Sequence, residues 1–127
     1  VIHMIGSEQV KDERRQYPRY KAPDVIAVAR VPDSPLDYYF HVADLSQNGL
    51  ALVTWSTEGF PLSPDAVVDI EVFSHLGSIQ CRGVVARLIP AEENGPTGFG
   101  MRVYGFGESG SQKWLELLES QKRLVSA

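Results

Sequence analysis

The chain has 127 residues, of which 43% are hydrophobic and 22% are charged, and its formal net charge at pH 7 is −4. This composition is ordinary for one globular domain with a buried core. The sequence has no apolar run near the roughly 20 residues that span a bilayer and no sustained apolar segment of a signal peptide. Its single cysteine, Cys81, excludes an intrachain disulfide and fits a reducing compartment. We therefore expect a cytoplasmic protein without membrane insertion.

A basic segment lies near the beginning of the chain, from Lys11 to Lys21. It holds five positive and two negative side chains, a local charge of +3, so the other residues sum to −7. An acidic protein that gathers its arginines in one place is suited to bind one compact anion rather than a nucleic-acid polymer. Pro18 fixes its own φ and disfavours helical geometry at Tyr17, so we expect an extended arm. A solvated charged tail without a ligand is the competing interpretation.

Six segments after the arm have the composition and turn boundaries of short β-strands. In one of them Val68, Ile70 and Val72 alternate with acidic residues, a pattern typical of a half-buried antiparallel strand. Gly83 lies within another and indicates a bulge or a close approach of backbone. The predicted strands are residues 24–31, 38–45, 50–55, 66–73, 79–88 and 97–104.

The last segment has a helical pattern. Ser109 and Gln112 have the spacing of a capping box. Apolar residues then recur at roughly helical spacing, at Trp114, Leu117, Leu118 and Leu124. We expect this apolar stripe to cover a barrel end or to pack in a homodimer. The predicted fold is therefore all-β with one helix: a six-stranded antiparallel β-barrel capped by a C-terminal α-helix.

A carboxylate, a hydroxyl and a glycine meet at one predicted turn, in the segment Asp44-Leu45-Ser46-Gln47-Asn48-Gly49. Asn-Gly is a strong hairpin signal, and side chains two apart in a strand share a face, so Asp44 and Ser46 should point the same way. A guanine N1–H and N2 amine need an acceptor such as a carboxylate, and a phosphate accepts from a hydroxyl. Gly49 lets a ligand approach the backbone. Alone, the motif is more often an Asx-type turn without a ligand.

Two motifs occur together in this chain. Arg15 to Arg19 has the form R-x-x-x-R, and Asp44 to Gly49 has the form D-x-S-x-x-G. Glycine-marked strands follow, at Gly83 and around Gly98-Phe99-Gly100. With this combination the sequence closely resembles the PilZ domain family. The resemblance divides the chain into an N-terminal tail, residues 1–12, and a PilZ-like domain, residues 13–127.

The resemblance implies a PilZ-type barrel that binds the bacterial second messenger cyclic di-GMP. It also implies the roles of individual residues. Arg15 and Arg19 would grip the phosphates and the O6/N7 edge of guanine. Asp44 would accept from guanine N1 and N2, and Ser46 would approach a phosphate or a base. Gly49 would leave room for the ligand.

Two further arginines enter through the same resemblance. Arg14 precedes the R-x-x-x-R motif, where an arginine tends to accompany an intercalated ligand dimer. Arg87 stands where relatives have an aromatic or basic residue against a base. We expect no metal, no cofactor other than the ligand and no enzymatic activity, because the three histidines are isolated and show no nucleophile–base spacing.

The expected function is a ligand-gated effector in which binding orders the arginine arm and signals to a downstream protein, in motility or biofilm regulation. The alternative is a protein-interaction module that keeps the barrel without binding nucleotide. A barrel that binds single-stranded nucleic acid would need basic and aromatic residues spread along one sheet face, whereas here the positive charge is confined to the arm.

Overall fold

The computed structural model describes residues 18–32, 34–55, 62–90 and 95–126. These ranges form seven strands and one helix. The strands are β1 (Tyr20–Lys21), β2 (Ile26–Arg30), β3 (Tyr38–Ser46), β4 (Gly49–Thr54), β5 (Val67–Ser74), β6 (Gly77–Ile89) and β7 (Thr97–Phe106), and the helix is α2 (Gly110–Ser126).

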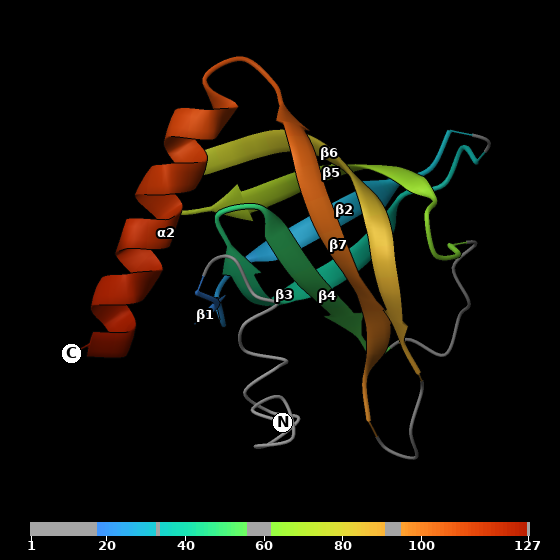
Figure 1. The fold of residues 1–127 in the computed structure, drawn as a ribbon, viewed down its shortest axis with the longest axis horizontal. Helices are drawn as coiled ribbons and strands as arrows, with labels where there is room; N and C mark the ends of the chain where they lie inside the picture. The colour runs from blue at the N-terminus through green and yellow to red at the C-terminus, as the bar shows by residue number, and fades with distance from the viewer. Residues whose placement is uncertain (1–17, 33, 56–61, 91–94, 127) are drawn as a thin grey trace, which may run out of the picture.

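Six of these strands close into the predicted antiparallel barrel, shown in Figure 1. The strand order is β1-β3-β2-β5-β6-β7-β4, and an additional β3–β4 pairing closes the sheet on itself. Strand β1 is an addition that the sequence pattern did not predict, because two residues are too few to show a period. It pairs with the end of β3, with Tyr20 opposite Leu45 and Lys21 opposite Asp44. The final residues of the basic segment are thereby attached to the barrel.

The interior of the barrel is filled by the apolar residues that alternate along the strands. Val68, Ile70 and Val72 are each at most 2% exposed, which confirms the period-2 pattern predicted for this strand. Phe40 of β3 and Phe99 of β7 meet edge to face across the barrel with ring centroids 5.2 Å apart.

Strand β6 contains two register shifts, one between Arg82 and Gly83 and one between Val85 and Arg87. The first confirms the bulge predicted at Gly83, where a Cβ would collide with the carbonyl oxygen of Arg102 on β7. The second shift places Arg87 opposite Gly100.

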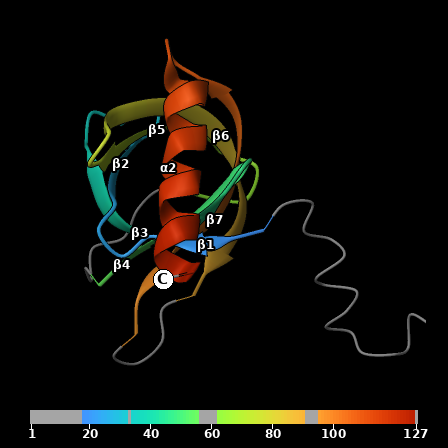
Figure 2. The same ribbon diagram turned by 90° about the vertical axis from the view of Figure 1, so that its left-hand side faces the viewer.

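Helix α2 lies across one end of the barrel, seen from the side in Figure 1 and face-on in Figure 2. Trp114, Leu117 and Leu118 are buried in the same core cluster as the strand residues, which confirms that the stripe covers the barrel end. The predicted capping box is wrong. Ser109 has a positive φ of 60°, whereas an N-cap takes extended backbone, and the Gln112 side chain instead donates to Glu116.

No described helix is long and apolar enough to cross a membrane, and the described residues contain no cluster that could hold a metal ion.

Candidate functional site

The Asp44–Gly49 motif forms the tight β3–β4 hairpin that the sequence predicts. Ser46 pairs with Gly49, Leu45 with Leu50, and Asp44 with Ala51. Leu45 and Leu50 are fully buried in the core. Because successive side chains alternate, Asp44 and Ser46 are directed to the outer face, as expected from their spacing.

Arg19 of the basic segment is an ion-pair partner of Asp44. Its Nη1 donates to Asp44 Oδ1 at 2.7 Å, and the two side chains are 27% and 30% exposed. The pairing of β1 with β3 places the two residues together, since Lys21 lies opposite Asp44. The structure therefore joins one residue from each of the two sequence motifs.

Gly49 lies directly beside this ion pair. A Cβ on Gly49 would stand 3.2 Å from Ser46 Oγ and 3.5 Å from Arg19 Nη2. The hydroxyl, the guanidinium and the glycine therefore meet on the outer side of the hairpin, at a point that is buried in the free protein, where Ser46 is 3% exposed. These contacts are tight for a Cβ, and the Met101 carbonyl oxygen is a third neighbour at 3.2 Å, so the packing in the free protein leaves room at Gly49 only for a hydrogen.

A row of small residues continues from this point across the outer face of the barrel. Asp44 on β3 is opposite Ala51 on β4, Ala51 is opposite Gly100 on β7, and Gly100 is opposite Arg87 on β6. At about 4.8 Å between strands, the row covers about 14 Å from Asp44 to Arg87 along the sheet. Arg87 leans over Gly100, because a Cβ there would lie 3.2 Å from Arg87 Nε.

Arg102 belongs to the same surface and was not predicted from the sequence. It is an exposed residue of β7 that pairs with Gly49 on one side and Val84 on the other. Among the described residues, neither Arg87 nor Arg102 has a hydrogen-bond or ion-pair partner. The small-residue surface is thus bordered by Arg19, Asp44 and Ser46 at one end, by Arg87 at the far end of the row, and by Arg102 directly beside Gly49.

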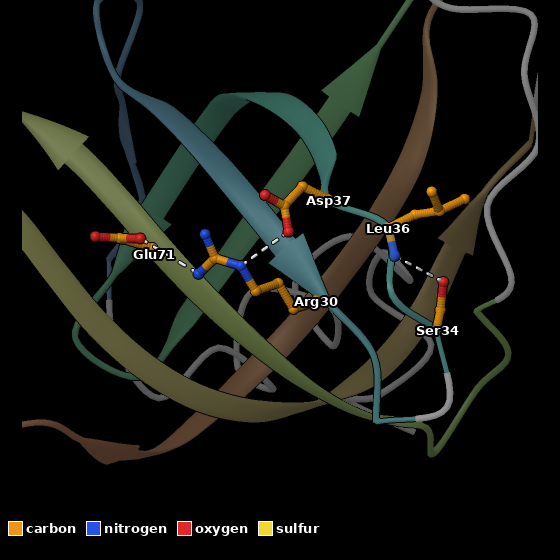
Figure 3. Close-up of polar contacts among 5 residues, drawn as sticks. All are labelled: Arg30, Ser34, Leu36, Asp37 and Glu71. Atoms are coloured by element: carbon orange, nitrogen blue, oxygen red, sulfur yellow. Dashed lines mark hydrogen bonds and ion pairs between the residues drawn. The ribbon is translucent and has the colours of Figure 1, made fainter.

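The arginines on the opposite side of the barrel are neutralised by carboxylates. Arg30 contacts Asp37 at 2.9 Å and Glu71 at 3.3 Å, as Figure 3 shows. Arg82 contacts Asp69 at 2.6 Å, and these pairs line a surface depression of about 620 Å³ over β5, β6 and β7. Because its cations are already paired, this depression is less suited to an anion than the surface beside Gly49.

Two predicted site residues, Arg14 and Arg15, lie outside the described residues. The structure brings together Arg19, Asp44, Ser46 and Gly49, and it places Arg87 at the other end of the same row. Trp114 is a second residue that the sequence did not connect with the site. Its indole N–H donates to the backbone carbonyl of Ser46 at 2.9 Å.

The geometry defines a small closed barrel with a polar and cationic site on its outer side. The segment that precedes the first long strand contributes Arg19 to this site. A protein-family comparison matches residues 13–119 to the PilZ domain. The chain belongs to the PilZ domain family. A comparison with curated protein sequences gives no significant match.

Solved structures with this fold include three of particular relevance. MrkH from K. pneumonia, solved in complex with c-di-GMP, is 21% identical with a TM-score of 0.70, covering 84% of this chain and 51% of MrkH. The Bacillus subtilis inhibitor of motility MotI/DgrA is 15% identical with a TM-score of 0.68, over 86% of this chain and 51% of that protein. The PilZ domain of YcgR from Escherichia coli, solved with c-di-GMP, is 18% identical with a TM-score of 0.64, covering 88% of this chain and 94% of that domain.

These identities establish the likeness of the fold. The chain spans about half the length of the MrkH and MotI/DgrA chains and nearly the whole of the isolated YcgR domain.

Proposed function

We propose that this protein binds cyclic di-GMP on the outer face formed by β3, β4, β7 and β6 and acts as an effector of that messenger. The observation that carries the proposal is the meeting of Arg19, Asp44 and Ser46 around Gly49. Membership of the PilZ family and the c-di-GMP complexes of MrkH and YcgR support the choice of ligand.

The chemistry of guanine fits the two charged groups. Guanine O6 and N7 accept hydrogen bonds from a guanidinium, and its N1–H and N2 amine donate to a carboxylate. In the free protein Arg19 and Asp44 satisfy each other. A bound guanine would replace this contact with charge-assisted hydrogen bonds to both groups, so neither charge is left unpaired.

The far end of the surface is suited to the rest of the ligand. The floor of Ala51, Gly49 and Gly100 carries no side chain larger than a methyl group. These residues are buried in the free protein, with Arg87 over Gly100, so a flat base or a phosphodiester ring can lie on the floor once that side chain moves aside. Arg87 and Arg102 then supply positive charge that no described carboxylate neutralises. We assign them to phosphate contact or to stacking on a base.

The arm completes the proposal. Arg15 would act with Arg19 on phosphate and guanine, and Arg14 would stack on the extra base of an intercalated ligand dimer. Ligand would bridge the arm, residues 14–21, and the barrel, ordering the arm beyond the Arg19–Asp44 contact that already exists in the free protein and changing the surface offered to a downstream protein. These roles rest on the family motif.

Isothermal titration of cyclic di-GMP tests the proposal. Wild-type protein should release heat on binding, and the Arg15→Ala, Arg19→Ala double variant should not. Cyclic di-AMP is the matched control ligand, because adenine lacks both O6 and the N2 amine and should bind far more weakly. Two ligands per chain would support the role given to Arg14, whereas one ligand per chain would discard the intercalated dimer.

Hydrogen exchange of residues 12–21, with and without saturating ligand, tests the ordering of the arm. Increased protection supports the switch, and unchanged protection at saturation contradicts it. If cyclic di-GMP gives neither heat nor protection from thermal unfolding, the protein is better described as an interaction module that keeps the barrel without the ligand.

A further inference from the structure

A buried hydrogen bond links the candidate ligand site to helix α2. Trp114 is 1% exposed, and its Nε1 donates to the backbone carbonyl oxygen of Ser46 at 2.9 Å. The two residues are 68 positions apart in the sequence. A carbonyl removed from water needs such a partner, so this bond fixes where the end of β3 lies relative to the helix.

The same residue contributes to the ligand site through its side chain. Ser46 Oγ lies 3.2 Å from the position that a Cβ of Gly49 would occupy, and Arg19 Nη2 lies 3.5 Å from the same position. The hydroxyl therefore faces the candidate site while the carbonyl is held by the helix. A shift of α2 that moved the Trp114 indole would move the hydroxyl with it, because both groups belong to one short hairpin.

Side chains of the helix and of the hairpin both enter the core of the barrel. Leu117 and Leu118 of α2 share a buried cluster with Leu45 and Leu50, which flank the turn. The Phe106 ring packs against the Trp114 indole with centroids 5.6 Å apart. Closely packed interiors transmit strain, so a displacement of the helix would be felt at the turn to which Trp114 is hydrogen-bonded.

The helix also borders the base of the arm. A groove of about 300 Å³ lies between α2 and the segment leading into β1, lined among others by Pro18, Tyr20, Leu115 and Leu118. Figure 2 shows β1 passing beneath the C-terminal half of α2. Gln47 of the Ser46 turn lines the same groove, so the helix adjoins both the base of the arm and the turn.

We infer that Trp114 is a positioning residue for the ligand site, and that the docking of α2 and the binding of ligand are energetically coupled through its bond to Ser46. The coupling to ligand rests on the proposed cyclic di-GMP binding, whereas the positioning of the turn does not. By linkage, a ligand held against Ser46 favours the docked helix to the extent that the docked helix favours the ligand.

Trp114→Phe is the discriminating variant, since it keeps an aromatic ring and removes the N–H. Trp55→Phe is the matched control, because Trp55 is 61% exposed and lies just beyond the far end of β4. In ligand-free protein, Trp114→Phe should speed hydrogen exchange in residues 47–50 and at the Val103 amide, which donates to the Asn48 carbonyl at 2.8 Å. Unchanged exchange would overturn the positioning role.

The affinity for cyclic di-GMP is measured on the same two variants. Loss of one neutral hydrogen bond should weaken binding by about 3- to 10-fold in Trp114→Phe and leave Trp55→Phe within about twofold of wild type. Faster exchange in Trp114→Phe with wild-type affinity would overturn the coupling. No binding by wild-type protein would contradict the proposed function, and the ligand-free exchange would still decide whether Trp114 holds the turn.

A stability control separates positioning from general destabilisation. Val72→Ala removes buried volume in β5, a strand that carries none of the candidate site residues. If it lowers the melting temperature as much as Trp114→Phe but keeps wild-type affinity, the loss in Trp114→Phe belongs to the hydrogen bond. Equal losses of affinity in both variants would attribute the effect to stability alone and overturn the inference.

Discussion

Arg19 and Asp44 form an ion pair, 2.7 Å between Nη1 and Oδ1, at the point where the basic segment joins the end of β3. Both side chains keep more than a quarter of their surface exposed. Partly exposed pairs of this kind contribute only about 0–1 kcal/mol to folding. The pair is therefore better suited to hold two opposite charges ready for a ligand than to stabilise the barrel.

The first prediction concerns the Asp44 carboxylate. Asp44→Asn keeps the shape of the side chain but removes the charge and one acceptor, so it should weaken cyclic di-GMP binding roughly 10- to 150-fold. The melting temperature should change little, because the ion pair contributes little to folding. Titration calorimetry and thermal unfolding measure the two effects.

Asp69→Asn is the control for this prediction. It makes the same chemical change in the exposed Arg82–Asp69 pair, on the outer face of β5. The Asp69→Asn variant should bind cyclic di-GMP with the affinity of wild type. Equal losses in both variants would mean that overall charge, rather than the position of Asp44, determines binding.

The second prediction concerns Arg87 and Arg102, the arginines of the candidate surface that have no partner in the described part of the chain. Arg87→Ala and Arg102→Ala should each weaken ligand binding roughly 3- to 30-fold, since each removes a charge-assisted contact at a partly exposed site. Binding by these variants should also depend less steeply on salt than binding by wild type. Arg82→Ala removes a guanidinium already paired with Asp69, so it should leave both the affinity for the ligand and its dependence on salt unchanged.

The local parts of this structure follow from the sequence. Each predicted strand overlaps an observed one, because alternation of apolar residues and the Asn48-Gly49 turn are short-range signals. The shared face of Asp44 and Ser46 was predictable for the same reason.

The long-range parts do not follow from it. The placement of Arg102 beside Gly49 depends on the β4–β7 register, which depends in turn on barrel closure. A helical period identifies the buried face on which Trp114 lies, but it does not specify the acceptor for the indole N–H. That acceptor, the Ser46 carbonyl, is determined by the packing of α2 on the barrel end.

The third prediction contrasts two glycines of β7. A Cβ at Gly98 would collide with the Leu52 carbonyl oxygen and lie 2.9 Å from Val53 Cα, so only movement of paired backbone could accommodate it. Gly98→Ala should lower the free energy of unfolding by about 3 kcal/mol or more. A Cβ at Gly100 meets only the flexible Arg87 side chain, so Gly100→Ala should cost about 1 kcal/mol or less.

Urea denaturation measures the free energy of unfolding of the Gly98→Ala and Gly100→Ala variants against wild type. Gly100→Ala should remain folded yet bind cyclic di-GMP more weakly than wild type, because the added methyl displaces Arg87 and fills part of the floor. A Gly98→Ala variant as stable as wild type would contradict the β4–β7 register. Unchanged affinity in Gly100→Ala would place the ligand elsewhere.

The fourth prediction concerns Gln121, which is 4% exposed and whose Oε1 has no hydrogen-bond partner in the described part of the protein. A buried acceptor without a partner is unfavourable, so Gln121→Met, which has a similar shape, should raise the free energy of unfolding by about 1 kcal/mol. The exposed Gln112→Met is the control and should change stability by less than about 0.5 kcal/mol. A destabilised Gln121→Met would show that the amide has a partner in solution.

The last prediction concerns pH and the buried Cys81. Burial raises the pKa of this thiol from 9.0 to about 12, with a smaller contribution from the negative charge of Asp69. In the unfolded chain the thiol ionises near its ordinary value, so above pH 9 the unfolded state binds fewer protons than the folded state. The stabilisation associated with the neutral thiol is therefore complete below pH 9 and is lost as the pH rises toward 12.

Comparison of wild type with Cys81→Ala measures this effect. The free energy of unfolding of wild type relative to the variant should begin to fall near pH 9 and should fall by about 1.4 kcal/mol per pH unit from about pH 10 to pH 11. The variant is less stable at pH 7, because it leaves a small cavity in the core. The difference in the free energy of unfolding between wild type and Cys81→Ala should therefore be constant near pH 7 and narrow as the pH rises through 9. A constant difference from pH 7 to pH 10.5 would mean that the thiol ionises equally in both states and is not held away from water.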